Sequence, residues 1–176
     1  SLQEPAEGLI SKLVEKKIPV LFILGTRSDL ARFNQLSQNL SLRYSGKTIF
    51  DEAMPVYNPN FSAFSLADET KAWFTGLPPL TVPLGDYQVP NSARIILNQR
   101  IGSVETSRPL VLLNESLDGR SGLIAGEGIW KWRLFNYAKF TNHQAFNEFI
   151  NKIIQYLSLK EQKKNFRVYH PVNFKE

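Results

Sequence analysis

The apolar residues of the first forty positions follow two different patterns. Residues 4–17 carry them at helical spacing, which predicts an amphipathic helix. Residues 18–24 are apolar at every position, which is typical of a strand buried on both faces of a parallel sheet. Thr26–Asp29 then has the form of a capping box, and apolar spacing predicts a second helix over residues 30–40. Helix, buried strand, tight turn and helix in this order predict a doubly wound α/β domain.

The middle of the chain is rich in proline and aromatic residues. Six prolines lie between Met54 and Pro90, and such density favours loops and edge strands over a repeating βαβ unit. We therefore expect an insertion over about residues 52–92, packed onto the domain by its aromatic side chains. Short elements are predicted in and beside it, namely strands at 47–50 and 82–89 and a helix at 67–74.

Regular patterns return after residue 92. Asp118-Gly119-Arg120 has the composition of a hairpin turn, and Thr141 with Gln144 forms a second capping box before an amphipathic helix. The remaining pattern predicts strands at 93–99, 109–113 and 121–125, a helix at 129–137 and a last helix that continues to Leu157. The whole chain, residues 1–176, is thus expected to be one α/β domain, a three-layer sandwich with a mostly parallel or mixed sheet of the flavodoxin type.

Composition narrows the function classes. The chain has 176 residues, 43% of them hydrophobic, and it has no cysteine, so disulfides, thiolate metal sites and a cysteine nucleophile are excluded. No apolar run approaches the roughly 20 residues that span a bilayer. The sequence begins without methionine, which is expected for a fragment of a longer chain.

The net charge of +5 is unevenly distributed. Residues 1–119 have a net charge of −1, whereas residues 120–176 have +6. Lys160, Lys163 and Lys164 follow the last predicted helix, where cations interact favourably with the helix dipole. Because a dense basic patch is missing, nucleic acid is not expected as a partner. Binding to an anionic polymer or lipid surface stays a weaker alternative.

The glycines before the fourth predicted helix form a candidate binding loop. Gly126 and Gly128 follow a predicted strand, so their amides could bind an anion. Lys131 occupies the position of the third glycine in a Gly-x-Gly-x-x-Gly motif, so a dinucleotide site is not indicated. The alternative is that the glycines allow a sharp turn under Trp130 and Trp132.

The two strand-to-helix turns supply the other candidate groups. Ser28 lacks the Gly-x-Ser-x-Gly context of a hydrolase nucleophile, and a serine at a helix start is more economically a cap. Two histidines without metal-ligand spacing give no metal site and no cofactor. Because strand ends meet at one edge of an α/β sheet, we expect a ligand or interaction site from both turns. Its candidate residues are Gly25, Thr26, Arg27, Ser28, Asp29, Gly126, Glu127, Gly128, Trp130 and Arg133.

The segment Lys-Lys-Ile-Pro-Val-Leu-Phe-Ile-Leu-Gly resembles the nucleophile strand of class I glutamine amidotransferases. Matched on Pro19, the resemblance places Leu24 where that family has its cysteine, and Thr26 where it has a glycine. No histidine follows the late strand, and Glu127 is the remaining carboxylate. The resemblance therefore implies a domain that lacks amidotransferase activity, because neither thiol nor base is present.

The segments Gly126–Leu134, Gln155–Leu157 and Phe166–Val168 resemble the C-terminal part of large bacterial membrane-anchored proteins. Those proteins often combine an amidotransferase-like domain with a von Willebrand type A-like domain. The resemblance implies a cell-envelope or periplasmic location, membrane attachment only through the parent chain, and first strands upstream of Ser1.

Two functional hypotheses follow. The first is a non-catalytic binding or interaction module with an unknown protein or small-ligand partner, for which a homodimer is left open. The alternative is a hydrolase of different chemistry that uses Ser28, Asp29 and Glu127 at the strand ends. The non-catalytic module is favoured over an enzyme, since the sequence has neither a cysteine nucleophile nor a histidine-based triad.

Overall fold

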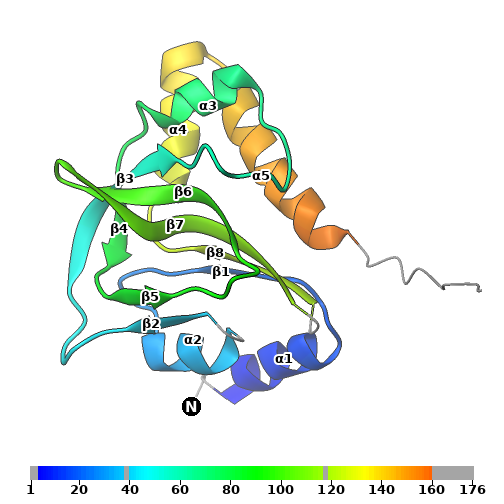
Figure 1. The fold of residues 1–176 in the computed structure, drawn as a ribbon. Helices are drawn as coiled ribbons and strands as arrows, with labels where there is room; N and C mark the ends of the chain where they lie inside the picture. The colour runs from blue at the N-terminus through cyan, green and yellow to red at the C-terminus, as the bar shows by residue number, and fades with distance from the viewer. Residues whose placement is uncertain (1–3, 38–39, 117–118, 160–176) are drawn as a thin grey trace, which may run out of the picture.

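The computed structural model describes residues 4–37, 40–116 and 119–159. Helices and strands are mixed along the chain, with a run of consecutive strands before the last two helices (Figure 1). The described helices are α1 (Glu4–Glu15), α2 (Leu30–Leu36), α3 (Asp68–Phe74), α4 (Ile129–Phe140) and α5 (Gln144–Ser158). The described strands are β1 (Val20–Ile23), β2 (Ser41–Arg43), β3 (Phe50–Tyr57), β4 (Leu80–Pro83), β5 (Asp86–Gln88), β6 (Arg94–Ile101), β7 (Val104–Ser116) and β8 (Gly119–Ile124).

Six strands form one open sheet in the order β1-β8-β7-β6-β3-β4, and β2 pairs with β5 in a separate ribbon. Only β1 and β8 run parallel among these described pairs, whereas all the others are antiparallel. The expectation of a mixed α/β fold is confirmed, but that of a mostly parallel sheet is wrong. The flavodoxin-like topology is not confirmed.

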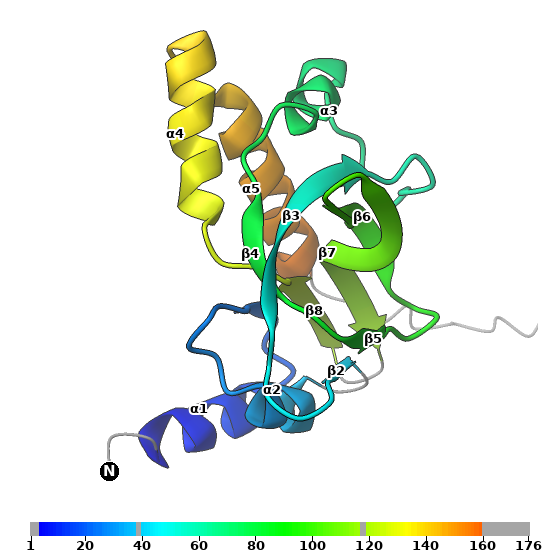
Figure 2. The same cartoon turned by 90° about the vertical axis from the view of Figure 1, so that its left-hand side faces the viewer.

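The sheet lies between two layers. Helices α3, α4 and α5 cover one face, while α2 and the β2–β5 ribbon cover the other (Figures 1 and 2). The larger core is on the first face, and its largest fully buried side chains are aromatic, namely Trp73, Phe74, Trp132 and Phe149. These rings meet edge-on or tilted at centroid distances of 5.1–6.2 Å, which is the geometry that aromatic pairs prefer.

The proline-rich stretch 52–92 contributes most of β3 and all of β4 to the main sheet, and β5 to the ribbon. Two of its prolines are compatible with the sheet because of how β3 and β4 pair. β4 pairs with β3 only from Phe50 to Ala53, so Pro55 lies beyond the end of β4. Pro83 belongs to β4, which is an edge strand, where a missing N–H is tolerated.

The ends of the helices differ from the expected capping boxes. Asp29, and not Thr26, caps α2, and its carboxylate accepts a hydrogen bond from the Arg32 amide over 3.0 Å. Thr141 ends α4 in a left-handed conformation with φ +55° instead of starting α5. The side chain of Asn142 accepts a hydrogen bond from the Gln144 amide instead.

After residue 92 the predicted elements are present, but β7 is much longer than the predicted strand at 109–113. The predicted strands at 93–99, 109–113 and 121–125 correspond to β6, β7 and β8, and the two last helices correspond to α4 and α5. Earlier boundaries shifted: α2 ends at Leu36, β3 begins only at Phe50, and the predicted strand at 82–89 is divided between β4 and β5. Lys160, Lys163 and Lys164 lie outside the described residues.

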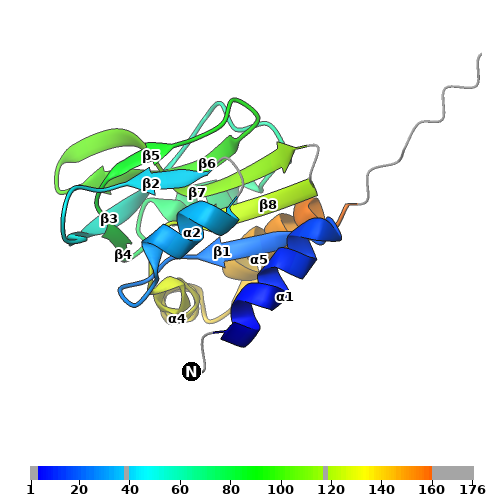
Figure 3. The same cartoon turned by 90° about the horizontal axis from the view of Figure 1, so that it is seen from below.

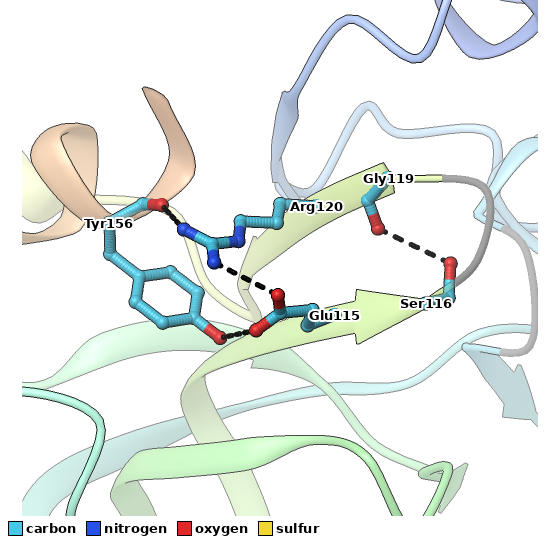
Figure 4. A network of polar contacts seen from close by, with 5 residues as sticks. All are labelled: Glu115, Ser116, Gly119, Arg120 and Tyr156. Atoms are coloured by element: carbon cyan, nitrogen blue, oxygen red, sulfur yellow. Dashed lines mark hydrogen bonds and ion pairs between the residues drawn. The ribbon is translucent and has the colours of Figure 1, made fainter. Parts of the chain in front are cut away.

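A polar network joins α5 to the β7–β8 hairpin (Figure 4). The guanidinium of Arg120 donates to the carbonyl of Tyr156 over 2.7 Å and to the carboxylate of Glu115 over 2.9 Å. The Tyr156 hydroxyl donates to the same carboxylate, and Arg120 lies 4.7 Å from the Tyr156 ring centroid. The Arg120 hydrogen bond lowers the pKa of Glu115, whereas burial raises the pKa of Tyr156.

Candidate functional site

The two turns singled out by the sequence meet where β1 ends and α4 begins. Between them lies an open cavity of about 430 Å³. Six of the ten candidate residues line it: Gly25, Arg27, Ser28, Glu127, Gly128 and Trp130. The four that do not line it are Thr26, Asp29, Gly126 and Arg133. Ile23, Leu24 and Ile129 add apolar surface to the same cavity.

Glu127 connects the two turns. Its carboxylate accepts hydrogen bonds from the amide and the hydroxyl of Thr26, each 2.9 Å long. The amide of Thr26 contributes most to lowering the pKa of Glu127, and Lys131 and Arg27 lower it further. A side chain at Gly25 would place a Cβ only 2.9 Å from the carboxylate oxygen, so glycine permits this contact. The carboxylate is therefore a structural acceptor between β1 and α4.

Ser28 and Asp29 are also engaged in local structure. The Ser28 hydroxyl oxygen accepts a hydrogen bond from the Gly25 amide over 2.9 Å, which tightens the turn after β1. Asp29 caps α2. No histidine lines the cavity among the described residues.

The glycines around Glu127 have steric roles. Gly128 has φ +109°, a conformation that L side chains rarely adopt, and it immediately precedes α4. Gly126 is buried, and a Cβ there would lie 2.8 Å from the Leu80 side chain. The main chain of Glu127 pairs with Thr81 of β4 in both directions, at 2.9 and 3.0 Å. These contacts favour the turn interpretation of the two glycines over an anion-binding loop.

The two tryptophans of α4 have opposite environments. Trp132 is fully buried, whereas Trp130 is 61% exposed. Leu134 and Tyr137 follow Trp130 at helical spacing and are 57% and 55% exposed. Ile23, at the end of β1, is 52% exposed and shares the cavity with Trp130. We call Ile23, Trp130, Leu134 and Tyr137 the α4–β1 surface.

Apart from Trp130, the residues of this surface were not predicted as a site, because large apolar residues on a helix usually face the core. The available signal was the large number of apolar residues in α4. They lie on the core side of the helix, with Trp132, and on the opposite side, with Trp130, Leu134 and Tyr137. The apolar stripe of a surface helix normally faces the core, so the core does not account for a second apolar side. Arg133 is exposed on the same helix, away from the cavity.

A second cavity, of about 540 Å³, lies between α3 and the α4–α5 turn. Its polar side chains serve neighbouring helix ends. Glu148 accepts hydrogen bonds from the Ala67 amide and the Thr70 hydroxyl at the start of α3. Asn136 accepts one from the Phe146 amide over 2.9 Å. In the described part of the chain, no group of three or more His, Cys, Asp or Glu residues could hold a metal ion.

Comparisons with known proteins do not show a family for this chain. No protein-family model matches the chain, and no curated protein matches it. Among solved structures, the chain is similar to one described as the mmIFT52 N-terminal domain, with 14% sequence identity and a TM-score of 0.41. The match covers 89% of this chain and 72% of that chain. Similarity at this level carries no argument about function.

The resemblance to class I glutamine amidotransferases is wrong. No family model supports it, and the solved structure found is a different domain. The physical reason is that an apolar strand ending in glycine occurs in many covered sheets, and Leu24 is simply a buried core residue on the α2 side of this one. The lost nucleophile, the bacterial origin and the periplasmic location came only with the resemblance and have no other support. None of the described helices is long and apolar enough to span a membrane.

Proposed function

We propose that the chain is a protein-binding module that recognises its partner through the α4–β1 surface. The observation that carries the proposal is the exposure of Ile23, Trp130, Leu134 and Tyr137, each more than half accessible. Ile23 and Trp130 line one cavity, and Leu134 and Tyr137 follow Trp130 at helical spacing on α4. Exposed clusters of large apolar side chains mark interaction sites, and tryptophan and tyrosine are the residues that contribute most to such interfaces.

The placement of the surface supports this function. Trp132 fixes α4 to the core from the opposite side, so the outward face of the helix is held rigidly. Glu127 joins the start of α4 to the end of β1 through Thr26. A preformed surface loses little conformational entropy when a partner binds, which favours affinity.

The cavity chemistry supports binding over hydrolysis. Ser28, Asp29 and Glu127, the residues of the hydrolase alternative, are each engaged in hydrogen bonds that hold the turns. A small-ligand site would need polar groups that converge on the open space and are not already paired there. A serine-directed fluorophosphonate probe tests the alternative: labelling that disappears in Ser28→Ala would establish it.

Site-specific photo-crosslinking tests the proposal. A photoreactive benzoylphenylalanine replaces Leu134 in the full protein, expressed in the cells from which it comes. The control position is Asn147, which is also exposed on a helix but lies on α5 among polar neighbours. We expect a discrete protein adduct from position 134 and none from position 147.

A second variant makes the test specific. Trp130→Ala with Tyr137→Ala, in the protein that carries the crosslinker at position 134, removes most of the apolar area but no buried side chain. We expect the adduct to disappear while the unfolding temperature stays the same. Equal adducts from positions 134 and 147, or none from either, would contradict the proposed function.

A further inference from the structure

A buried hydrogen-bond donor belongs to the wall of the second cavity, between α3 and the α4–α5 turn. Asn136 of α4 lines this cavity of about 540 Å³ and is only 1% exposed. Its Oδ1 accepts a hydrogen bond from the Phe146 amide over 2.9 Å, and this fixes the orientation of the side-chain amide, because a backbone N–H cannot accept. Its Nδ2 has no hydrogen-bond partner among the described residues. Nδ2 is therefore the polar group that Asn136 leaves for the cavity.

An unpaired donor in this position is unfavourable for the fold. A buried polar group without a partner costs about 1–3 kcal/mol, and the large majority of buried side-chain polar atoms in folded proteins are paired. The bond to Phe146 uses only the oxygen of the Asn136 amide, so the start of α5 does not account for the nitrogen. A ligand that enters the cavity with an acceptor would account for it.

Other polar groups around the same cavity have free hydrogen-bonding capacity. Glu69 and Gln144 are exposed, and their side chains have no partner among the described residues. Each oxygen of the half-buried Glu148 carboxylate accepts one hydrogen bond, from the Ala67 amide or the Thr70 hydroxyl, and keeps a second lone pair. The cavity thus combines a buried donor with several acceptors.

The rest of the wall is apolar. Phe140, which is 43% exposed, contributes its ring, and two alanines complete this side. Two carboxylates line the cavity, whereas no Lys, Arg or His among the described residues does. The nearby Nζ of Lys139 lies 5.3 Å from the Phe140 ring centroid, outside the lining. An anionic ligand is therefore disfavoured, because like charges in contact are unfavourable.

The hydrogen-bonding groups of the cavity narrow the class of ligand. An ammonium group has donors only, so it would leave Asn136 unpaired. A carboxylate or phosphate has acceptors but lies unfavourably beside Glu69 and Glu148. A hydroxyl group both donates and accepts, so a ligand with several hydroxyls matches the donor and the acceptors together. A sugar ring adds C–H groups, which can pack against the Phe140 ring.

We propose that this cavity binds a neutral sugar unit. Nδ2 of Asn136 donates to a sugar oxygen, Glu69 and Glu148 accept from sugar hydroxyls, and Phe140 packs against the ring. The volume of about 540 Å³ is within the usual range of small-molecule sites. The inference goes beyond the proposed function, since the cavity lies at the end of α4 opposite to Trp130. Figure 3 views the molecule from the Trp130 end of that helix.

Nuclear magnetic resonance titration of the ¹⁵N-labelled full chain tests the site without a variant of the buried residue. The probes are D-glucose, D-galactose, D-mannose and N-acetylglucosamine. We expect at least one of them to bind saturably with a Kd of about 0.1–10 mM. It should shift the side-chain amide signals of Asn136 and Gln144, but not those of Asn147. Absence of saturable shifts at Asn136 with every probe up to about 100 mM would overturn the inference.

Ligands of other chemistry test the class. The 6-phosphate of the best sugar is the anionic probe, cyclohexylammonium is the cationic one, and N-acetylalanine N-methylamide represents a peptide. We expect each to bind at least about tenfold more weakly than the best sugar, because each lacks part of the match described above. Equal or tighter binding of any of the three at the Asn136 signals would overturn the assignment to a neutral sugar.

Two matched variants test the position of the site. Gln144 and Asn147 both carry exposed amides on α5, but only Gln144 lines the cavity. We expect Gln144→Ala to weaken binding of the best sugar by at least about threefold and Asn147→Ala to leave it unchanged, with equal unfolding temperatures. Equal affinity of the two variants would overturn the assigned site.

The methyl glycoside of the best sugar distinguishes two sources of the ligand. A sugar unit inside a glycan is blocked at its anomeric oxygen, as the methyl glycoside is, whereas a free sugar is not. Equal binding of the glycoside supports a glycan unit, and its loss supports a free sugar; both results support the site. If every sugar fails, adducts from position 134 would still leave the proposed function standing.

Discussion

The indole N–H of Trp132 donates a hydrogen bond to the carbonyl of Pro78 over 2.8 Å. This bond fixes α4 to the segment that leads into β4, and it explains why Trp130, two residues earlier, faces solvent. A helix turns by about 200° over two residues, so the burial of one side chain exposes the other. The rigidity of the proposed binding surface thus depends on a buried residue that takes no part in binding.

Replacement of Trp132 should be costly. Trp132→Phe removes the hydrogen bond to Pro78 and leaves a cavity, so we expect the free energy of unfolding to fall by about 2–4 kcal/mol. Trp130→Phe is the matched control, and it should change stability by less than about 0.5 kcal/mol. Urea unfolding followed by circular dichroism measures both. Equal effects of the two substitutions would contradict the assigned orientation of α4.

Gly128→Ala tests the entry into α4. The positive φ of +109° is strained for alanine, so we expect a loss of about 1–2 kcal/mol in unfolding free energy. Gly8→Ala in α1 is the control, because a Cβ at Gly8 has no atom within 4 Å and α1 is helical there. That substitution should be neutral or slightly stabilising. A neutral Gly128→Ala would show that the turn before α4 is not fixed.

Arg120→Met tests the network between α5 and the β7–β8 hairpin. The substitution removes the donors to Tyr156 and Glu115 and should lower the unfolding free energy by about 1–3 kcal/mol. Lys71→Met at the exposed Asp68–Lys71 pair should have no measurable effect, because solvent-exposed pairs contribute little. Thermal unfolding compares the two. If Arg120→Met were equally silent, α5 would be held by its apolar face alone.

Stability should fall at high pH because of Tyr87. Burial raises the pKa of Tyr87 to about 12, and its hydroxyl donates to the carbonyl of Pro83 over 2.8 Å. The folded state retains the proton more strongly than the unfolded state, in which the pKa is near 10. The stabilisation is complete below pH 10 and is lost between pH 10 and 12, by about 2–3 kcal/mol.

Tyr87→Phe is the matched control for this pH dependence. The variant starts less stable, since the Pro83 carbonyl loses its donor, but its stability should change less between pH 10 and 12. Urea midpoints at several pH values across this range measure the difference. Parallel pH profiles of the two proteins would contradict the burial of the Tyr87 hydroxyl.

Much of the secondary structure follows from local patterns, but the direction of the strands does not. The stripe from Phe146 to Leu157 predicts α5 because only one face of that helix meets the sheet. Residues 18–24 and 109–113 are apolar at every position, and this indicates cover on both faces. Antiparallel strands such as β7 receive the same cover here, from the helices on one face and from α2 and the ribbon on the other.

The candidate site was predicted in part. The turns at Gly25–Asp29 and Gly126–Trp130 do meet, because β1 and β8 are parallel neighbours and their carboxyl ends lie together. The exposure of Leu134 and Tyr137 was not predicted, since side-chain type alone does not tell which of two apolar helix faces meets the sheet. The orientation of α4 depends on Trp132, whose ring packs against those of Trp73 and Phe149.

Acrylamide quenching of tryptophan fluorescence tests whether the partner binds through the α4–β1 surface. Trp130 is the exposed tryptophan, whereas Trp73 and Trp132 are 1% and 0% accessible. We expect one quenchable tryptophan in the free protein and none after addition of the partner captured from position 134. Trp130→Phe should show no quenchable component in either state. A Trp130 that stays fully quenchable in the complex would contradict binding through the α4–β1 surface.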